Sequence, residues 1–134
     1  MALEKILVVD DEPDIRMLVC MTLQRLGGFQ VRAEASGRAA LAALGEGYAP
    51  DLVLLDVMMP EMDGVQTLQA MRLLPGMSDT PICFLTAKVQ PTEVARWQGL
   101  GVCRILSKPF SPATLIGQLQ ESWHQCRTSQ SQTS

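Results

Sequence analysis

The chain has 134 residues, of which 47% are hydrophobic and 19% are charged, and its net charge is −3. This length predicts a single globular domain, and the composition excludes a disordered or fibrous chain. No clustered basic face is visible, so we expect no direct binding of nucleic acid. The first apolar run is too short for a signal peptide or a membrane span, which predicts a soluble, cytoplasmic protein without membrane contact.

Short aliphatic runs alternate along the chain with longer segments of helical period. In chain order we predict a strand at 5–9, a helix at 13–26, a strand at 29–34, a helix at 36–45, a strand at 51–55, a helix at 65–74, a strand at 81–85, a helix at about 91–99, a strand at 103–106 and a helix from 112 to about 126. Strict alternation predicts an α/β fold with a doubly wound, five-stranded parallel sheet and five helices. Residues 4–126 would form the domain, and the Ser-, Gln- and Thr-rich residues 127–134 a flexible polar tail.

The cysteines are widely spaced and include no C-x-x-C pair; they are Cys20, Cys83, Cys103 and Cys126. Such spacing does not suggest zinc binding or redox chemistry. Because most of them lie in apolar stretches, we expect small buried hydrophobic residues rather than a disulfide framework.

Polar residues stand at the ends of four predicted strands: Asp10 and Asp11, then Asp56, then Thr86, and finally Ser107 and Lys108. The carboxyl ends of parallel strands meet at one edge of a sheet, so these side chains should share a crevice. Three carboxylates repel one another unless a cation offsets their charge, and an all-oxygen set favours magnesium. With Lys108 as a point charge for an anion, the set predicts a phosphoryl-transfer site whose nucleophile is Asp56.

Each of these residues has a simpler explanation when it is taken alone. Asp10, Asp11 and Glu12 precede Pro13, a favoured first helical residue, and one or two of these acids could merely cap the helix and complement its dipole. Thr86 could be a turn hydroxyl and Lys108 a solvated surface charge. Their joint placement at strand ends favours the shared site.

Four motifs carry a family resemblance: ILVVDDEPDIR at 6–16, DLVLLDVMMPEMDG at 51–64, PICFLTA at 81–87 and SKPF at 107–110. In this order and at these spacings they make residues 4–126 resemble the receiver domain of two-component response regulators, in its stand-alone, chemotaxis-regulator-like form. The resemblance implies a flavodoxin-like sheet with strand order 2-1-3-4-5. It also implies that Asp56 is the phosphoacceptor.

The resemblance further implies a Mg²⁺ site. Asp11, Asp56 and the backbone carbonyl of Met58 would bind the ion directly, and Asp10 would help through water. The Lys108 ammonium and the Thr86 hydroxyl would contact the phosphoryl group.

One further feature is implied by the resemblance. A cis peptide bond would precede Pro109. Lys88 lies two residues after Thr86, as Met58 does after Asp56, where side chains can overhang the phosphoryl group. We expect Lys88 to influence the lifetime of the phosphorylated form.

Position 105 departs from the family pattern, because Ile105 stands where an aromatic residue usually swings inward. We hypothesise that the change on phosphorylation is muted, or is reported by the backbone around residues 88–96. One interpretation of this edge is an altered partner or homodimer face that contains Trp97 and Ile105. Helical spacing favours a core position for Trp123, and His124 is expected at the surface.

The function predicted is a signalling switch that catalyses only its own phosphorylation and dephosphorylation. Its donor would be a sensor histidine kinase or a small acyl phosphate, and its partners a downstream effector or a histidine phosphotransfer protein. No output domain is visible. The alternatives are an intermediate carrier in a phosphorelay, an aspartyl-phosphate hydrolase, and a receiver that binds partners without phosphorylation. The hydrolase is disfavoured because its nucleophile usually follows the first strand and its substrate cap needs more chain.

Overall fold

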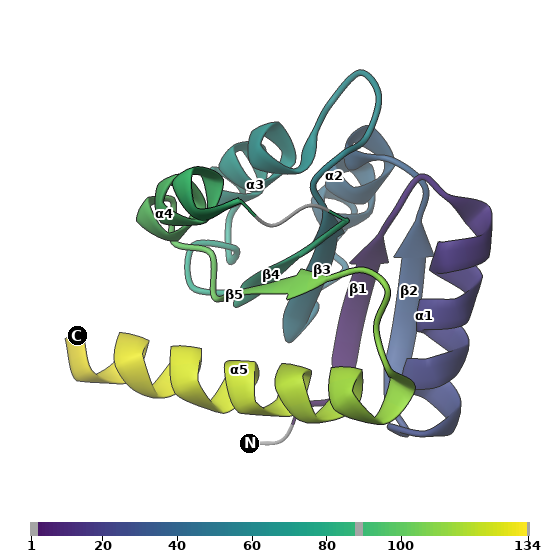
Figure 1. The fold of residues 1–134 in the computed structure, drawn as a ribbon. Coiled ribbons are helices and arrows are strands. Elements are labelled where there is room, and N and C mark those ends of the chain that lie inside the picture. Colours follow the sequence, from purple (N-terminus) through teal and green to yellow (C-terminus); the bar gives the residue numbers. More distant parts are fainter. Residues whose placement is uncertain (1–2, 88–89, 134) are drawn as a thin grey trace.

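Strands and helices alternate strictly in the computed structural model (Figure 1), which describes residues 3–87 and 90–133, with residues 127–133 through their backbone alone. The strands are β1 (Lys5–Val9), β2 (Gln30–Glu34), β3 (Leu52–Asp56), β4 (Ile82–Thr86) and β5 (Arg104–Ser107). The helices are α1 (Pro13–Arg25), α2 (Gly37–Gly45), α3 (Gly64–Arg72), α4 (Pro91–Gly99) and α5 (Pro112–Thr133). The predicted α/β alternation is confirmed, and most bounds shift by only one or two residues.

The sheet has the strand order β2-β1-β3-β4-β5, and every neighbouring pair is parallel. This is the order that the family resemblance implied. Parallel neighbours require crossover connections, and here each crossover contains a helix. All strands therefore present their carboxyl ends at the same edge.

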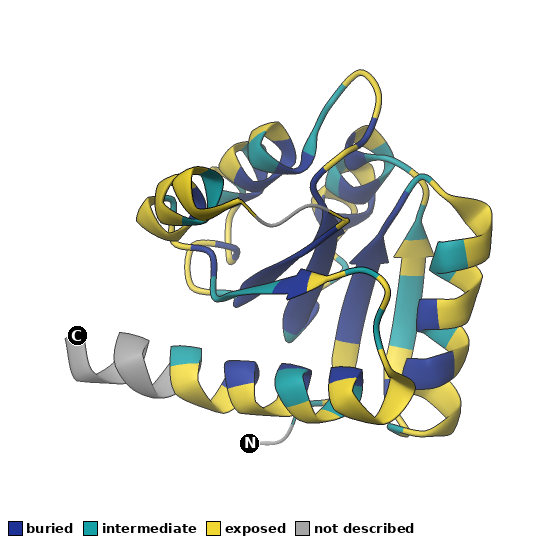
Figure 2. Ribbon diagram, in the orientation of Figure 1, coloured by how far each residue is buried: buried dark blue, intermediate teal, exposed yellow. Residues whose placement is uncertain are grey.

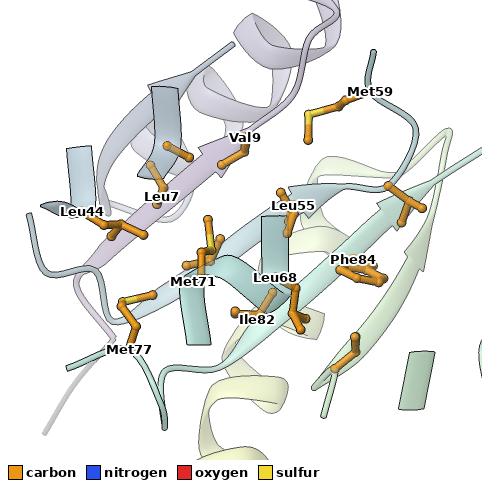
Figure 3. Close-up of a cluster of buried hydrophobic side chains, with 14 of the residues drawn as sticks. Leu7, Val9, Leu44, Leu55, Met59, Leu68, Met71, Met77, Ile82 and Phe84 are labelled. Atoms are coloured by element: carbon orange, nitrogen blue, oxygen red, sulfur yellow. The ribbon is translucent and has the colours of Figure 1, made fainter. Parts of the chain in front are cut away.

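Two apolar clusters fill the space on the two faces of the sheet, because alternate side chains of a strand point to opposite faces. One cluster joins Leu7 and Leu55 of the sheet to Leu44 of α2 and Leu68 of α3 (Figure 3). Trp97 of α4 belongs to the same cluster. The other joins the opposite face to α1 and α5; its members include Ile6, Leu54, Leu23, Leu119 and Trp123. The helices thus cover both faces.

The central strands are the most deeply buried part of the chain (Figure 2). All residues of β3 and β4 are buried, whereas the edge strands β2 and β5 are mostly of intermediate exposure. A strand covered on both faces must be apolar throughout, which explains the unbroken runs LVLL and ICFL. Asp56 and Thr86 are the polar residues that end these runs. They are therefore held at the ends of two fully buried strands.

The expectation for the cysteines is wrong for one pair. Cys103 and Cys126 form a disulfide across β5 and α5, with a Cα–Cα distance of 6.1 Å. Cys20 and Cys83 are free, and Cys83 is buried as expected. The two bridged residues are 23 positions apart, and only the packing of α5 against the sheet brings them together.

Helix α5 continues to Thr133, beyond the end expected near Cys126. No Gly or Pro follows Cys126 to end the helix, and Ser, Gln and Thr are tolerated in helices. The flexibility of the tail 127–134 stays a prediction. Within the described residues, no helix is both long and apolar enough to cross a membrane.

Candidate phosphoryl-acceptor site

The carboxyl edge of the sheet gathers the polar residues predicted from the strand ends. Asp10 and Asp11 directly follow β1, Asp56 ends β3, Thr86 ends β4, and Lys108 directly follows β5. β1 lies beside β3, β3 beside β4, and β4 beside β5, so the strands that carry these residues are neighbours. Thr86 pairs in register with Ser107, and the Lys108 backbone N–H donates to the Thr86 carbonyl at 2.8 Å.

Lys108 is the cation of this site. Its Nζ lies 3.4 Å from Asp56 Oδ1 and 3.3 Å from Asp10 Oδ2. The Lys108 side chain is 11% exposed, whereas those of Asp10 and Asp56 are only 1% and 2% exposed. One ammonium thus lies between two buried carboxylates, and the interpretation of Lys108 as a solvated surface charge is wrong.

Asp10, Asp11 and Asp56 form a compact acidic cluster. One oxygen from each lies within 4.8 Å of the others. Asp11 Oδ1 and Asp56 Oδ2 are buried and accept no hydrogen bond from any residue that the structure describes. Buried oxygens without donors are costly unless a ligand completes them, and carboxylate oxygens are the ligands that Mg²⁺ prefers. The donor set therefore fits a magnesium ion.

The charge balance of the cluster changes the protonation of Asp56. Burial and, after it, the negative charge of Asp10 raise the pKa of the Asp56 carboxyl from 3.8 to about 7, against the opposing effect of Lys108. Burial lowers the pKa of Lys108, but the charges of Asp56 and Asp10 outweigh it, so that this pKa is raised. Lys108 therefore stays charged at neutral pH. Among the described residues, it is the only cation that forms an ion pair with any of the three acids of the cluster.

The capping alternative for the acids applies only in part. Asp10 Oδ1 accepts a hydrogen bond from the Glu12 backbone N–H at 2.9 Å, which fixes the turn into α1. The N-cap of α1 is Glu12, and its side chain makes no capping hydrogen bond. Arg16 Nη1 donates to the Asp10 carbonyl at 2.8 Å. One oxygen of Asp10 is thus structural, and the other faces Lys108.

Glu12 is a neighbour of the site that sequence reasoning missed. Its Oε1 lies 3.1 Å from Lys108 Nζ, although the Glu12 side chain is 59% exposed. The adjacency of Glu12 to Asp10 and Asp11 was the available signal. Sequence position alone could not show that its carboxylate reaches the lysine, which is 96 residues away.

The loop after β3 is held close to the site by the start of α3. Asp63 and Gln66 form a reciprocal capping box, with hydrogen bonds of 2.8 Å and 3.0 Å. A Cβ on Gly64 would lie 2.7 Å from the Asp56 carbonyl oxygen, so only glycine allows this approach. The Gly64 backbone N–H also donates to the Val57 carbonyl at 2.9 Å.

The other predicted site residues have mixed outcomes. Thr86 is 1% exposed at its strand end, and the cis peptide bond before Pro109 is confirmed. Met58 is 74% exposed, which leaves its side chain at the surface beside Asp56, while the role of its backbone carbonyl stays a prediction. Lys88 lies outside the described residues.

The face that contains Ile105 differs from expectation at one tryptophan. Trp97 is 1% exposed and packs edge-on against Phe84, with ring centroids 5.5 Å apart. Trp97 is therefore too deeply buried to anchor a partner, and the interpretation that gave it this role is wrong. Ile105 is half-buried and packs against the same cluster. Trp123 is core and His124 is exposed, both as predicted.

Comparison with known proteins agrees with this architecture. A family model for the response regulator receiver domain matches residues 6–120, and the chain belongs to this family of two-component signalling. Chemotaxis protein CheY4 of Vibrio cholerae has a similar structure, with a TM-score of 0.84 and 37% identity over 90% of this chain and 99% of that one.

Similar curated proteins are longer. The transcriptional regulatory protein CpxR homolog of Haemophilus influenzae is 37% identical over 88% of this chain and 49% of its own length. The phosphate regulon transcriptional regulatory protein PhoB of Escherichia coli is 35% identical over 87% of this chain and 50% of its own length. The chain thus spans about half the length of the curated relatives that it matches.

Proposed function

We propose that this receiver domain accepts a phosphoryl group on the Asp56 carboxylate, with Mg²⁺ held by Asp10, Asp11 and Asp56. The observation that carries the proposal is the placement of a buried aspartate at a strand end, 3.4 Å from Lys108 and within an acidic cluster. A nucleophile needs a neighbouring positive charge where negative charge develops, and Lys108 supplies it. Membership of the receiver family supports the same assignment.

In the proposed step, an oxygen of Asp56 attacks the phosphorus atom and forms a new P–O bond, while the bond from phosphorus to the donor breaks. With an acyl phosphate donor, the carboxylate of the donor leaves. Bound Mg²⁺ would neutralise charge on the acidic cluster and on the phosphoryl oxygens. Lys108 Nζ would pair with a phosphoryl oxygen, and the Thr86 hydroxyl would donate a hydrogen bond to another.

Two properties of the site suit Asp56 to this role better than Asp10 does. Asp56 Oδ2 accepts no hydrogen bond from a described residue, so it is available to react. Asp10 also has one such oxygen, Oδ2, but its Oδ1 accepts from the Glu12 backbone N–H, which ties this carboxylate to the turn into α1. An Asp56 carboxyl whose pKa lies near 7 is only partly ionised at neutral pH, so a bound cation would favour its nucleophilic form.

The test is intact-mass spectrometry after incubation with acetyl phosphate and Mg²⁺. Wild type should gain one phosphoryl group, and Asp56→Asn none, whereas Asp51→Asn should label like wild type. Asp51 is a matched control because it lies at the opposite end of β3, where its Oδ2 accepts from the Glu4 and Lys5 backbone N–H groups. An adduct that persists in Asp56→Asn would refute the assignment.

The remaining parts of the proposal concern partners. A sensor histidine kinase would be the physiological donor, and a downstream effector or a histidine phosphotransfer protein would receive the signal, in the cytoplasm. The names of the relatives describe transcriptional and DNA-binding regulators, and this chain matches about half of each. Transfer of labelled phosphate from Asp56 to a histidine phosphotransfer protein would distinguish a phosphorelay carrier from a terminal switch.

A further inference from the structure

The disulfide between Cys103 and Cys126 joins the entrance of β5 to the far part of α5. Cys103 directly precedes β5, and Cys126 follows Trp123, the last buried residue in the part of α5 whose side chains are described. Both bridged residues have intermediate exposure, whereas Cys83 is fully buried in β4. A small thiol in solution can therefore reach the bridge but not Cys83.

The docking of α5 does not depend on this bridge. Leu115, Leu119 and Trp123 are 0%, 0% and 3% exposed, and they pack against the sheet. Arg104 adds a second tie, because its Nη1 donates to the Gln118 carbonyl at 3.2 Å and pairs with the Glu121 carboxylate at 3.1 Å. Opening the disulfide should leave α5 anchored as far as Trp123 and release only the part of the helix beyond that residue.

Cys103, one half of the bridge, also lies in the wall of a surface cavity between α4 and β5. The cavity has a volume of about 270 Å³. Its lining residues are Val94, Gln98, Val102, Cys103, Arg104 and Ile105. Cys103 is thus shared between the cavity wall and the tether to α5, so the state of its sulfur affects both.

The surroundings of Cys103 can accommodate a free thiol as well as a disulfide. Cys103 Sγ lies 3.2 Å from the Ser122 carbonyl oxygen, an acceptor for a thiol S–H. Arg104 Nη1 lies 3.5 Å from the Ser122 hydroxyl, which places a cation at the same turn of α5.

We propose that Cys103 and Cys126 form a reversible oxidative modification site that controls the surface made by α4, β5 and the end of α5. Closure uses the disulfide of a small thiol as oxidant. One cysteine thiolate attacks that disulfide and releases one small thiol, and the other cysteine then attacks the mixed disulfide and releases the second. Two electrons pass from the cysteine pair to the oxidant, and reduced small thiol reverses both steps. The proposal does not rest on phosphorylation of Asp56.

The first test measures the thiols of the full chain after equilibration with mixtures of oxidised and reduced glutathione. Alkylation after denaturation and intact-mass spectrometry should show four reactive thiols at the reducing end and two at the oxidising end, because the chain has four cysteines and one bridge. Cys20→Ser should keep the same midpoint with one thiol fewer. Cys103→Ser should lose the transition and instead accumulate one glutathione adduct on Cys126.

The second test asks whether the redox state changes the surface. Hydrogen exchange of the amides at 124–126 should become at least tenfold faster on reduction, while exchange in β3 stays unchanged. The Cys103→Ser variant should exchange at the fast rate in both buffers. Four outcomes would overturn the proposal: a bridge that never forms, a bridge that survives a large excess of reduced glutathione, an unchanged midpoint in Cys103→Ser, or equal exchange in the two redox states.

Discussion

Replacing Asp56 by asparagine should stabilise the protein when no divalent cation is present. Burial and the charge of Asp10 raise the pKa of Asp56 from 3.8 to about 7, which corresponds to roughly 4 kcal/mol of unfavourable free energy for the ionised form. Asparagine has nearly the same shape and no charge, so it removes this cost. This cost is already net of the attraction of Lys108, which lowers the same pKa, so we expect a gain of about 3–4 kcal/mol.

The sign of the pH dependence is set by the direction of the shift. Between pH 3.8 and about 7 the folded chain holds a proton on Asp56 that the unfolded chain has lost, so the stability of wild type falls as the pH rises through this window. The advantage of Asp56→Asn should accordingly be small at pH 4 and complete at pH 8. Urea unfolding in EDTA, followed by circular dichroism at both pH values, measures it.

Asp63→Asn is the matched control for this comparison. It makes the same chemical change at the N-cap of α3, outside the acidic cluster, where Asn caps a helix about as well as Asp. Its stability should stay within about 0.5 kcal/mol of wild type at both pH values. Mg²⁺ at ten times its dissociation constant should stabilise wild type by about 1.4 kcal/mol and Asp56→Asn by less. An Asp56→Asn protein that is no more stable than wild type at pH 8 in EDTA would refute the electrostatic reasoning.

Four further outcomes are expected. Lys108→Ala removes the cation 3.4 Å from Asp56 and should slow phosphorylation by acetyl phosphate on the order of a hundredfold, measured by intact mass; an unchanged rate would contradict its role. Lys88→Ala should change the decay rate of the phosphorylated form, and equal decay in mutant and parent would dismiss this idea. Beryllofluoride with Mg²⁺ should shift amide NMR signals around residues 88–96, whereas shifts confined to the acidic cluster would leave a signalling role for that segment without support. The disulfide joins residues 23 positions apart, and its reduction should lower the unfolding free energy of wild type by about 3 kcal/mol. The same reducing buffer should leave the unfolding free energy of Cys103→Ser unchanged, because this variant has no bridge.

Much of the site could be predicted because its residues are tied to strand ends. Asp10, Asp56 and Thr86 each close an apolar run, and the parallel order of β1, β3 and β4 brings such positions to one edge. The positions of the acidic cluster and of Lys108 could therefore be predicted from the ends of the apolar runs. The raised pKa of Asp56 could not be predicted in the same way, because it depends on burial and on the distance to Asp10.

The orientation of α4 was beyond the sequence for a different reason. The helix has nine residues, and Val94 and Trp97 give too short a pattern to show which face packs on the sheet. Packing against Phe84 decided that Trp97 is core. The hypothesis of an exposed tryptophan anchor failed at this point.

Local periodicity and the geometry of parallel strands were enough to predict the alternation of elements, the shared edge of the strand ends and the residue types available for phosphoryl transfer. Which distant residues meet depends on packing in the folded chain. Glu12 contacts Lys108 across 96 positions, and Cys103 bridges to Cys126 across 23. Both contacts depend on how β5 and α5 pack against the rest of the sheet, and neither has a periodic signature that could be read along the chain.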